Sequence, residues 1–368
     1  MPHQIPFMTL RPFRRLNRHW PVFLFAFCLI QQPRCRGSDA GKAPLVVYST
    51  HGKELLSEFE AGFERDHPNV DVRWLDMGSQ DVLDRVRSER ENPQADVWWG
   101  APSMLFQQAE KEGLLQQYRP SWAGEVSEEA RSAGDFWYGT YETPEVIAYN
   151  SAALKPEEAP QDWDDLLDPK WQNKIILRDP LASGTMRTIF CAMILRNYQT
   201  TGSPEAGFQW LKKLDANTKD YVANLTLLSQ KLARQEGLVT VWNMPDIELQ
   251  RAHYNYPLAY VIPKSGTPVV TDGIASLSQA KHADRAKQFY EYVTSKESIV
   301  LAAKKFYRIP CRKDIPNQEL PEWIRQTPIR TMPIDWKVLE EKSNEWMKHW
   351  DSQIRNKGSL QSGVVVSR

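Results

Sequence analysis

The sequence predicts an α/β protein built from two units, and three observations lead to this prediction. The chain has 368 residues, which is too many for one comfortable core and suits two domains of ordinary size. Hydrophobic residues make up 41% and charged residues 25%, a composition typical of globular proteins. Short apolar runs alternate with amphipathic helical patterns, the order expected of parallel sheets with helices on their faces.

The first unit is expected to begin with a buried strand at residues 45–48. The helix that follows has Leu55, Leu56, Phe59 and Phe63 on one face. A second strand at 70–74 alternates apolar and polar residues, a third covers 96–99, and another helix begins at about 103.

The second unit repeats this order after a new apolar strand at 142–150. The expected strands are 174–177, 238–242 and 258–262, and the expected helices are 184–198 and 246–253. A helix at 283–294 and a Trp-rich helical segment at about 320–350 follow, and Trp336, Leu339 and Trp346 are expected to pack that segment onto the body.

These elements define the predicted domain organisation. The predicted parts are a signal peptide at 1–40, a first part of lobe 1 at 44–141, lobe 2 at 142–262, a return to lobe 1 at 263–310, a C-terminal helical segment at 311–357 packed on the lobes, and a flexible tail at 358–368. The chain passes between the lobes in extended segments, which predicts a hinge and a central cleft.

The N-terminal segment has the pattern of an export signal. Residues 1–37 hold six arginines and no acidic residue, and the apolar run 21–30 (PVFLFAFCLI) is too short to cross a bilayer, which needs about 20 residues. A buried helix of the mature fold is the alternative. We expect cleavage within 31–42 and a periplasmic protein, without a lipid anchor at Cys35, because Gln-Pro-Arg precedes that cysteine instead of small residues.

The charge and cysteine content restrict the partners and cofactors. Beyond residue 37 the chain has 40 basic and 46 acidic residues, so nothing favours binding to nucleic acid or anionic membranes. Cys191 and Cys311 could form a disulfide in an exported protein, or Cys191 could be a buried free thiol in its apolar helix. No metal or cofactor is expected from two distant cysteines.

Five stretches in this order resemble the family 1 extracellular solute-binding proteins, which have the type II periplasmic-binding fold. They are LVVYSTHGKELLSEFEAGFE at 45–64, ADVWWGAPSMLFQQAEKEGLL at 95–115, WYGTYETPEVIAYNSAAL at 137–154, DPLASGTMRTIFCAMI at 179–194 and YVIPKSGTPVVTDGIASL at 260–277. The subgroup resembled binds ferric iron, phosphorylated sugars, phosphonates and thiamine. The resemblance implies a monomeric, non-enzymatic receptor that delivers a small ligand to the permease subunits of an ABC importer.

The loop after the first strand contains the candidate ligand contacts Ser49, Thr50 and His51. Ligands of open α/β sheets bind at the carboxyl ends of strands, so this loop is expected to face the cleft. Its hydroxyls and the first helical amides can bind an oxyanion, although a hydroxyl can also simply cap the helix. His51 is either a ligand contact or an exposed first-turn residue.

A second candidate loop contains Ser183, Gly184 and Thr185, which open the helix at 184–198. Hydroxyls and first-turn amides can bind an anion there, and the stretch matches the second-lobe loop that lines the cleft in the resembled family. Arg178, just before this loop, can form a bidentate contact with a phosphate or carboxylate, or pair with a surface acid.

The remaining candidates lie at other strand ends. Trp99 and Gly100 end the third strand, and Trp99 is expected at the cleft rather than in the core. Tyr141 and Glu142 lie where the chain enters the second lobe. Trp242 either packs or contacts the ligand, Asn243 can hydrogen-bond it, and Asp246 follows closely.

The stretch at 242–246 also bears on ferric iron. The ferric binders of the resembled family carry adjacent tyrosines here, since phenolate oxygen suits a hard cation. This chain has Trp-Asn-Met-Pro-Asp instead, and Asn255 separates Tyr254 from Tyr256. An organic anion, such as a phosphorylated or phosphonate compound, is therefore the expected ligand, with ferric ion as the alternative. An enzyme on the same fold ranks lower, because no G-x-S-x-G, P-loop or metal-hydrolase motif is present. A sensor-docking role also ranks below the importer, and the sequence leaves it open.

Overall fold

The computed structural model describes residues 41–356, so the predicted signal peptide and the whole of the predicted tail lie outside the described residues. The strands are β1 (Ala43–Ser49), β2 (Val70–Asp76), β3 (Val97–Pro102), β4 (Leu115–Gln116), β5 (Tyr138–Asn150), β6 (Ile175–Arg178), β7 (Thr218–Val222), β8 (Val239–Asn243), β9 (Leu258–Val261), β10 (Val269–Leu277) and β11 (Ile309–Pro310). The α-helices are α1 (Lys53–Asp66), α2 (Ser79–Ser88), α3 (Ser103–Lys111), α4 (Gly184–Thr201), α5 (Glu205–Asn217), α6 (Leu225–Ala233), α7 (Met244–Tyr254), α8 (Ala283–Val293), α9 (Lys296–Phe306), α10 (Glu322–Gln326) and α11 (Trp336–Gln353). The predicted α/β fold is confirmed.

The sheet combines parallel and antiparallel strands. Its order is β2-β1-β3-β10-β5-β8-β6-β7, and β4, β9 and β11 pair with β10 or β5 beside this path. Strand β1 is parallel to β2 and β3, and β6 is parallel to β7 and β8. The prediction of parallel sheets is wrong at β5 and β10, which run antiparallel to their neighbours, and at the short strands β4, β9 and β11 that pair with them. These two strands carry the chain out and back, so they run in opposite directions.

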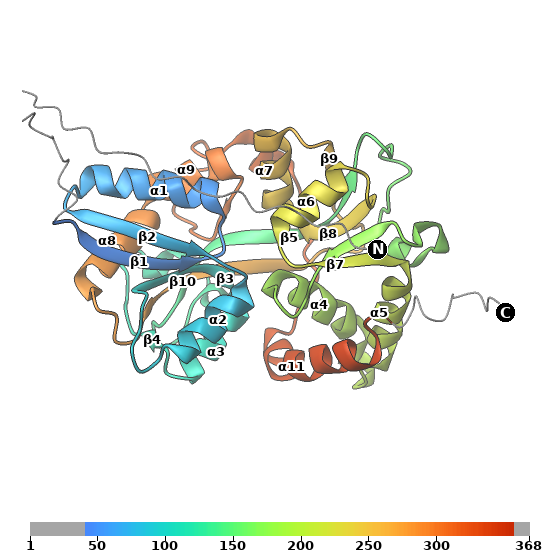
Figure 1. Cartoon of the computed structure of the whole chain (residues 1–368), viewed down its shortest axis with the longest axis horizontal. Coiled ribbons are helices and arrows are strands. Elements are labelled where there is room, and N and C mark those ends of the chain that lie inside the picture. Colours follow the sequence, from blue (N-terminus) through green and yellow to red (C-terminus); the bar gives the residue numbers. More distant parts are fainter. Residues whose placement is uncertain (1–40, 357–368) are drawn as a thin grey trace, which may run out of the picture. The chain divides into compact units, whose positions relative to one another are not determined.

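The long strand β5 joins two groups of strands (Figure 1). Its first half pairs with β10 as far as Pro144, and its second half, from Glu145, pairs with β8 and β9. We call β1, β2, β3 and their helices α1–α3, α8 and α9 lobe 1, and β6–β9 with α4–α7 lobe 2. The change of partner lies three residues beyond the predicted crossing at 142, and the exact lobe boundaries stay a prediction.

The helices follow their apolar patterns. In α1, Leu55, Leu56, Phe59 and Phe63 are buried on one face, as predicted. Helix α2 was not predicted, although Val82, Leu83 and Val86 form its buried face. Helix α4 is buried on nearly all sides over its first three turns. Apolar residues occur on every face of these turns, so the helix must pack against neighbours on every side.

The C-terminal helix α11 packs along α4, and the two lie side by side in Figure 1. Ring contacts join Trp350 to Phe190 and Trp346 to Tyr198, with centroids 5.4 and 5.2 Å apart. The predicted packing residues Leu339 and Trp346 are buried, whereas Trp336 is only partly buried. Cys191 and Cys311 are both buried free thiols, which settles the open question of a disulfide.

Candidate functional site

A cleft of about 560 Å³ lies where the carboxyl ends of the parallel strands from both lobes meet. The strand register explains its floor in lobe 1, because Ser49 pairs with Asp76 on β2 and with Trp99 on β3 at one edge of the sheet. Lobe 2 contributes the ends of β6 and β8 and the start of α4. The predicted site residues that line this cleft are Thr50, His51, Arg178, Ser183, Thr185, Trp242, Asn243 and Asp246.

Five predicted residues besides Glu142 do not line the cleft, namely Ser49, Trp99, Gly100, Tyr141 and Gly184. Ser49, Trp99 and Tyr141 are fully buried, and Trp99 packs edge-on against Phe59 in the lobe 1 core instead of facing the cleft. Gly100 has a positive φ of 92°, and a side chain there would come within 2.9 Å of His51 Nε2. Glycine therefore allows the histidine ring to pack against this strand end.

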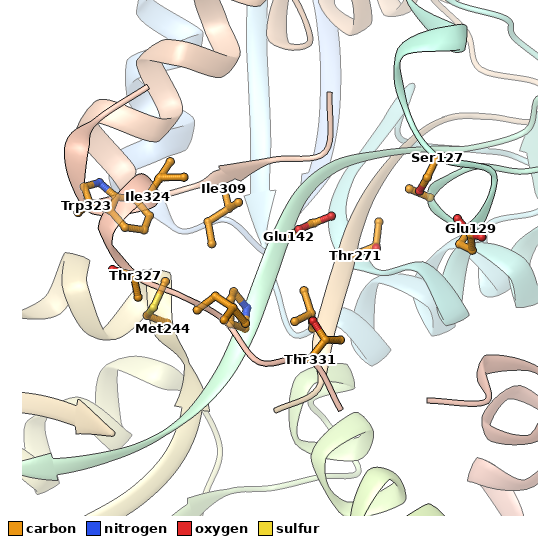
Figure 2. A pocket seen from close by; sticks show the side chains of 14 residues that line it. Ser127, Glu129, Glu142, Met244, Thr271, Ile309, Trp323, Ile324, Thr327 and Thr331 are labelled. Atoms are coloured by element: carbon orange, nitrogen blue, oxygen red, sulfur yellow. The ribbon is translucent and has the colours of Figure 1, made fainter. Parts of the chain in front are cut away.

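Glu142 lines a different pocket, of about 380 Å³, on the joining strands. Figure 2 shows its carboxylate with Thr271, Ile309 and Trp323, so the pocket involves β5, β10, β11 and the segment around α10. Desolvation raises the pKa of Glu142, while Lys313 opposes the rise. Glu142 was predicted to contact the ligand together with the cleft residues, but it does not line the cleft.

The loop after β1 holds His51 in a fixed position. Ser49 Oγ accepts a hydrogen bond from the His51 amide at 3.2 Å, and no side chain caps α1, whose N-cap is Gly52. His51 is 3% exposed, its ring lies edge-on to Tyr141 with centroids 5.4 Å apart, and its Nε2 has no hydrogen-bond partner. Burial, and then the charge of Arg308, lower the pKa of His51 well below its usual value, so the ring is neutral.

The start of α4 faces the cleft and also contacts lobe 1. Ser183 is the N-cap, and its Oγ accepts from the Met186 amide at 3.3 Å. The Gly184 amide donates to Ser79 Oγ, at the start of α2, at 2.7 Å. This glycine amide is thus occupied by lobe 1, and Thr185 is left as the first-turn residue that lines the cleft.

Arg178 ends β6 inside the cleft. Its guanidinium lies over the Trp242 ring, 5.3 Å from the centroid, and its Nε is buried without a hydrogen-bond partner. Desolvation lowers the pKa of Arg178, and nearby carboxylates, Asp246 first, oppose the shift. No ion pair of Arg178 is found within residues 41–356.

Asp246 organises the end of β8. Its Oδ2 accepts from Trp242 Nε1 and Asn243 Nδ2, both at 2.9 Å, and its Oδ1 pairs with Arg308 at 3.0 Å. Asn243 is also the N-cap of α7, since its Oδ1 accepts from the Asp246 amide at 2.9 Å. Asn243 and Asp246 therefore hold each other in place at the cleft edge.

Sequence reasoning missed several lining residues. Asp76 ends β2 and Ser79 begins α2, so the rule that ligands bind at strand ends would have found both once α2 was recognised. Tyr254 and Tyr256 lie at the end of α7 and just beyond it, and their rings stack with centroids 5.6 Å apart. Asp272 and Arg308 also line the cleft, although no local pattern in the sequence distinguishes them.

Two lining carboxyls have strongly altered acidity. Burial raises the pKa of Asp272 to about 7, with Arg308 opposing the rise. Although part of its side chain is open to solvent, desolvation also raises the pKa of Asp76 to about 6.

Among residues 41–356 no group of three or more His, Cys, Asp or Glu side chains is arranged to hold a metal ion. The same part of the chain has no helix long and apolar enough to cross a membrane.

Comparison with known proteins gives relatives that are named as periplasmic binding proteins. A probable ABC transporter periplasmic-binding protein, y4fP of Sinorhizobium fredii, is 28% identical over 324 residues, 84% of this chain and 86% of that protein. A putative 2-aminoethylphosphonate-binding periplasmic protein of Salmonella typhimurium is 28% identical over 253 residues, 67% of this chain and 71% of that protein.

A solved structure shows the same fold. The periplasmic binding protein AfuA from Actinobacillus pleuropneumoniae, with fructose-6-phosphate bound, is 25% identical with a TM-score of 0.74, over 86% of this chain and 99% of that chain. The family model described as bacterial extracellular solute-binding protein matches residues 58–331. The expected fold and the expected role of a solute receptor are thereby confirmed: this chain belongs to the bacterial extracellular solute-binding proteins.

Proposed function

We propose that this chain is the periplasmic binding protein of an ABC importer and that it captures a small anionic organic ligand between its lobes. A phosphorylated sugar or a phosphonate is the favoured class. Two similar proteins are named for, or hold, such compounds: 2-aminoethylphosphonate and fructose-6-phosphate. Both compounds carry a tetrahedral oxyanion, which the two lobes would bind together.

The unpaired guanidinium of Arg178 is the observation that carries this proposal. The buried arginines Arg308 and Arg312 form ion pairs with carboxylates, at 3.0 and 2.7 Å, and Arg187 donates to the Asn344 side chain at 3.0 Å. Arg178 lines the cleft, and within residues 41–356 its guanidinium has neither an ion pair nor a hydrogen bond. Holding a partly desolvated cation without an anion is costly, and a bound phosphate or phosphonate would supply the bidentate partner.

Residues from both lobes complete the proposed anion site. Thr185 and the first turn of α4 offer a hydroxyl and helical amides from lobe 2, where the helix dipole favours negative charge. Thr50 and the unpartnered Nε2 of His51 come from lobe 1. A ligand that contacts both lobes favours the closed arrangement, which the permease subunits would then recognise.

The proposal includes the finer points of the expected biology. We propose a monomer exported to the periplasm, with no nucleic-acid partner and no catalytic activity. The mildly acidic body of the chain supports the absence of a nucleic-acid partner. The transport proteins among its relatives support a receptor rather than an enzyme.

The start of α4 can be tested by removing its two hydroxyls. We expect the double variant Ser183→Ala/Thr185→Ala to lose the thermal stabilisation that phosphorylated sugars or phosphonates give to the wild type, a fall in affinity of at least about tenfold. Loss of the Ser183 cap lowers the stability of the free protein by about 1 kcal/mol, so each shift is measured against the same variant without ligand.

Thr200→Ala/Thr201→Ala is the matched control, since these exposed threonines lie at the other end of α4. It should keep the full ligand-induced shift. If the Ser183→Ala/Thr185→Ala protein were stabilised as much as the wild type, the anion site at α4 would have to be abandoned.

Ferric ion is the second candidate because Tyr254 and Tyr256 both line the cleft. The Tyr254 hydroxyl donates to Glu54, and this hydrogen bond, with burial, raises the pKa of Tyr254 to about 12, which disfavours a phenolate ligand. Absorbance of the protein titrated with ferric citrate distinguishes the two candidates. We expect no visible charge-transfer band, whereas a band lost in Tyr256→Phe would favour iron.

A further inference from the structure

The cleft contains more negative than positive groups. Its carboxylates are Glu54, Asp76, Asp81, Asp246 and Asp272, and its cations are Lys53, Arg178 and Arg308. A site that bound a plain anion would be expected to show the opposite balance, because each extra carboxylate repels the ligand. The excess of carboxylates therefore favours a ligand that carries a positive group in addition to its anionic group.

Two of the five carboxylates are already satisfied by the protein. Asp246 accepts from Trp242, Asn243 and Arg308. Glu54 accepts from the Tyr254 hydroxyl. These two acids hold the architecture of the cleft, so they do not account for the excess charge.

Asp272 differs from them in its surroundings. It lines the cleft and is only 9% exposed, yet its carboxylate has no hydrogen bond or ion pair with any residue of the described chain. Arg308 lies close enough to lower its pKa, but forms its ion pair with Asp246. Asp272 is thus a nearly buried acid that faces the cleft without a partner.

The backbone explains why Asp272 is presented to the cleft. Strand β10 shifts register at this residue against both neighbours, between Asp272 and Gly273 on the β5 side and between Asp272 and Ile274 on the β3 side. Such irregularities re-aim a side chain and recur beside functional sites. A hydrogen-bond donor for the Asp272 carboxylate would therefore have to come from a bound molecule.

The anion and cation sites come from different elements. Arg178 and the start of α4 belong to lobe 2, whereas Asp272 lies on the joining strand β10 and Asp76 ends β2 in lobe 1. Desolvation raises the pKa of Asp76 as it does that of Asp272. Unlike Asp272, Asp76 accepts a hydrogen bond from the Gly52 backbone. The unpaired cation and the unpaired acid of the cleft therefore lie on different elements.

Building on the proposed function, we infer that the ligand carries a cationic group, such as a primary ammonium, besides its oxyanion. Asp272 binds this cation, and Arg178 with the start of α4 binds the oxyanion. The ligand class is thus an amino-phosphonate or an amino-phosphate rather than a simple sugar phosphate.

Matched pairs of compounds test this inference by calorimetry. The first pair is 2-aminoethylphosphonate and propylphosphonate, in which a methyl group replaces the ammonium. The second is glucosamine 6-phosphate and glucose 6-phosphate, in which a hydroxyl replaces it. Above a pH of about 7, where Asp272 is ionised, we expect the amine of at least one pair to bind about 10- to 100-fold more tightly than its partner.

The variant Asp272→Asn makes the test specific, because it keeps the shape and removes the charge. We expect it to remove the advantage of the amine while the amine-free compound binds equally well or more tightly. A merely structural role for Asp272 would weaken both members alike. Asp81→Asn is the control: this acid also lines the cleft but is exposed, and its loss should leave the ratio within each pair unchanged.

The outcomes separate this inference from the proposed function. Amine-free compounds that bind as tightly as their amines, with binding lost in Arg178→Met, would overturn the cation site and leave the anion receptor standing. An amine preference that survives in Asp272→Asn would also overturn the assignment. If no member of either pair bound, both the cation site and the proposed phosphonate or phosphate class would be refuted.

Discussion

At the residue scale, Glu145 is the most unusual group near the cleft. It is fully buried on β5 opposite Asn243, and neither of its carboxyl oxygens has a hydrogen-bond partner. Burial raises the pKa of Glu145 well above its usual value, and the charges of Asp272 and Asp246 add to the rise. The raised pKa favours the protonated carboxyl in the folded protein, because the neutral form costs much less to bury than the charged one.

This raised pKa makes the free energy of unfolding depend on pH. Below about pH 4.5 both folded and unfolded chains hold the Glu145 proton, so the group has no effect. As the pH rises above this value, the unfolded chain releases its proton and the folded chain retains it, so stability falls. The fall is about 1.4 kcal/mol for each pH unit up to the pKa of the folded state.

We expect Glu145→Gln to remove this contribution, because the amide keeps the shape and does not titrate. The unfolding free energy of the variant, measured in urea from pH 5 to pH 8, should fall less steeply than that of the wild type. Asp272 and Asp76 titrate in the same direction and remain in both proteins. Glu91→Gln, whose side chain is 92% exposed, should leave the slope unchanged, and identical slopes for Glu145→Gln and wild type would refute a buried neutral Glu145.

Sequence reasoning at this scale located residues at strand and helix ends but not their orientation. Ser183, Thr185, Asn243 and Asp246 line the cleft, since any loop after a parallel strand opens at that edge. Trp99 ends the predicted strand at 96–99, but it lies within β3, where alternation turns its ring into the core. Asp272 lies in mid-strand, and only the irregular register of β10, which depends on its neighbours, aims it at the cleft.

At the element scale, the starts of α2 and α4 meet across the cleft. The Gly184 amide donates to Ser79, and the Thr188 hydroxyl lies 3.6 Å from Met104 Sδ of α3. A Cβ on Gly184 would come within 2.8 Å of Ser79 Oγ and 3.0 Å of the Pro102 ring. The glycine is therefore required by the close approach of the lobes rather than by its own helix.

We expect Gly184→Ala to oppose lobe closure without harming lobe 2, because the overlap disappears when the lobes separate. Overlap of this kind costs about 1–3 kcal/mol, so ligand affinity should fall about 5- to 100-fold while the melting temperature of the free protein stays near that of the wild type. Calorimetric titration and thermal melting measure the two quantities.

Gly207→Ala is the contrasting variant, since a Cβ there would lie 2.4 Å from the Ile194 Cα within lobe 2 itself. It should lower the melting temperature of the free protein. Should Gly184→Ala bind ligand as tightly as the wild type, the contact between α2 and α4 would not belong to the binding-competent form.

Many of the elements were predictable because they have a local apolar pattern. The runs at 45–48 and 238–242 became β1 and β8, and the helix predicted at 283–294 became α8. Strand direction was not predictable at β5 and β10, since it depends on how the chain passes between distant units. Helix α2 was missed because its three apolar residues lie among seven polar ones.

At the scale of the whole molecule, the two groups of strands share β5 and β10 and enclose one cleft that takes side chains from both lobes. A binding site within one lobe would not take side chains from both. Ligand binding and lobe closure are therefore expected to be coupled, so that residues of either lobe control the same affinity.

Native mass spectrometry of the protein, after incubation with the small molecules of a bacterial extract and removal of the excess, tests the central claim most directly. The wild type should retain one small anionic compound per chain, and Arg178→Met should retain none. Arg196→Met, whose arginine pairs with Asp164 away from the cleft, should retain it like the wild type. Equal retention by Arg178→Met, or no compound on the wild type, would contradict a receptor for small anions held at Arg178.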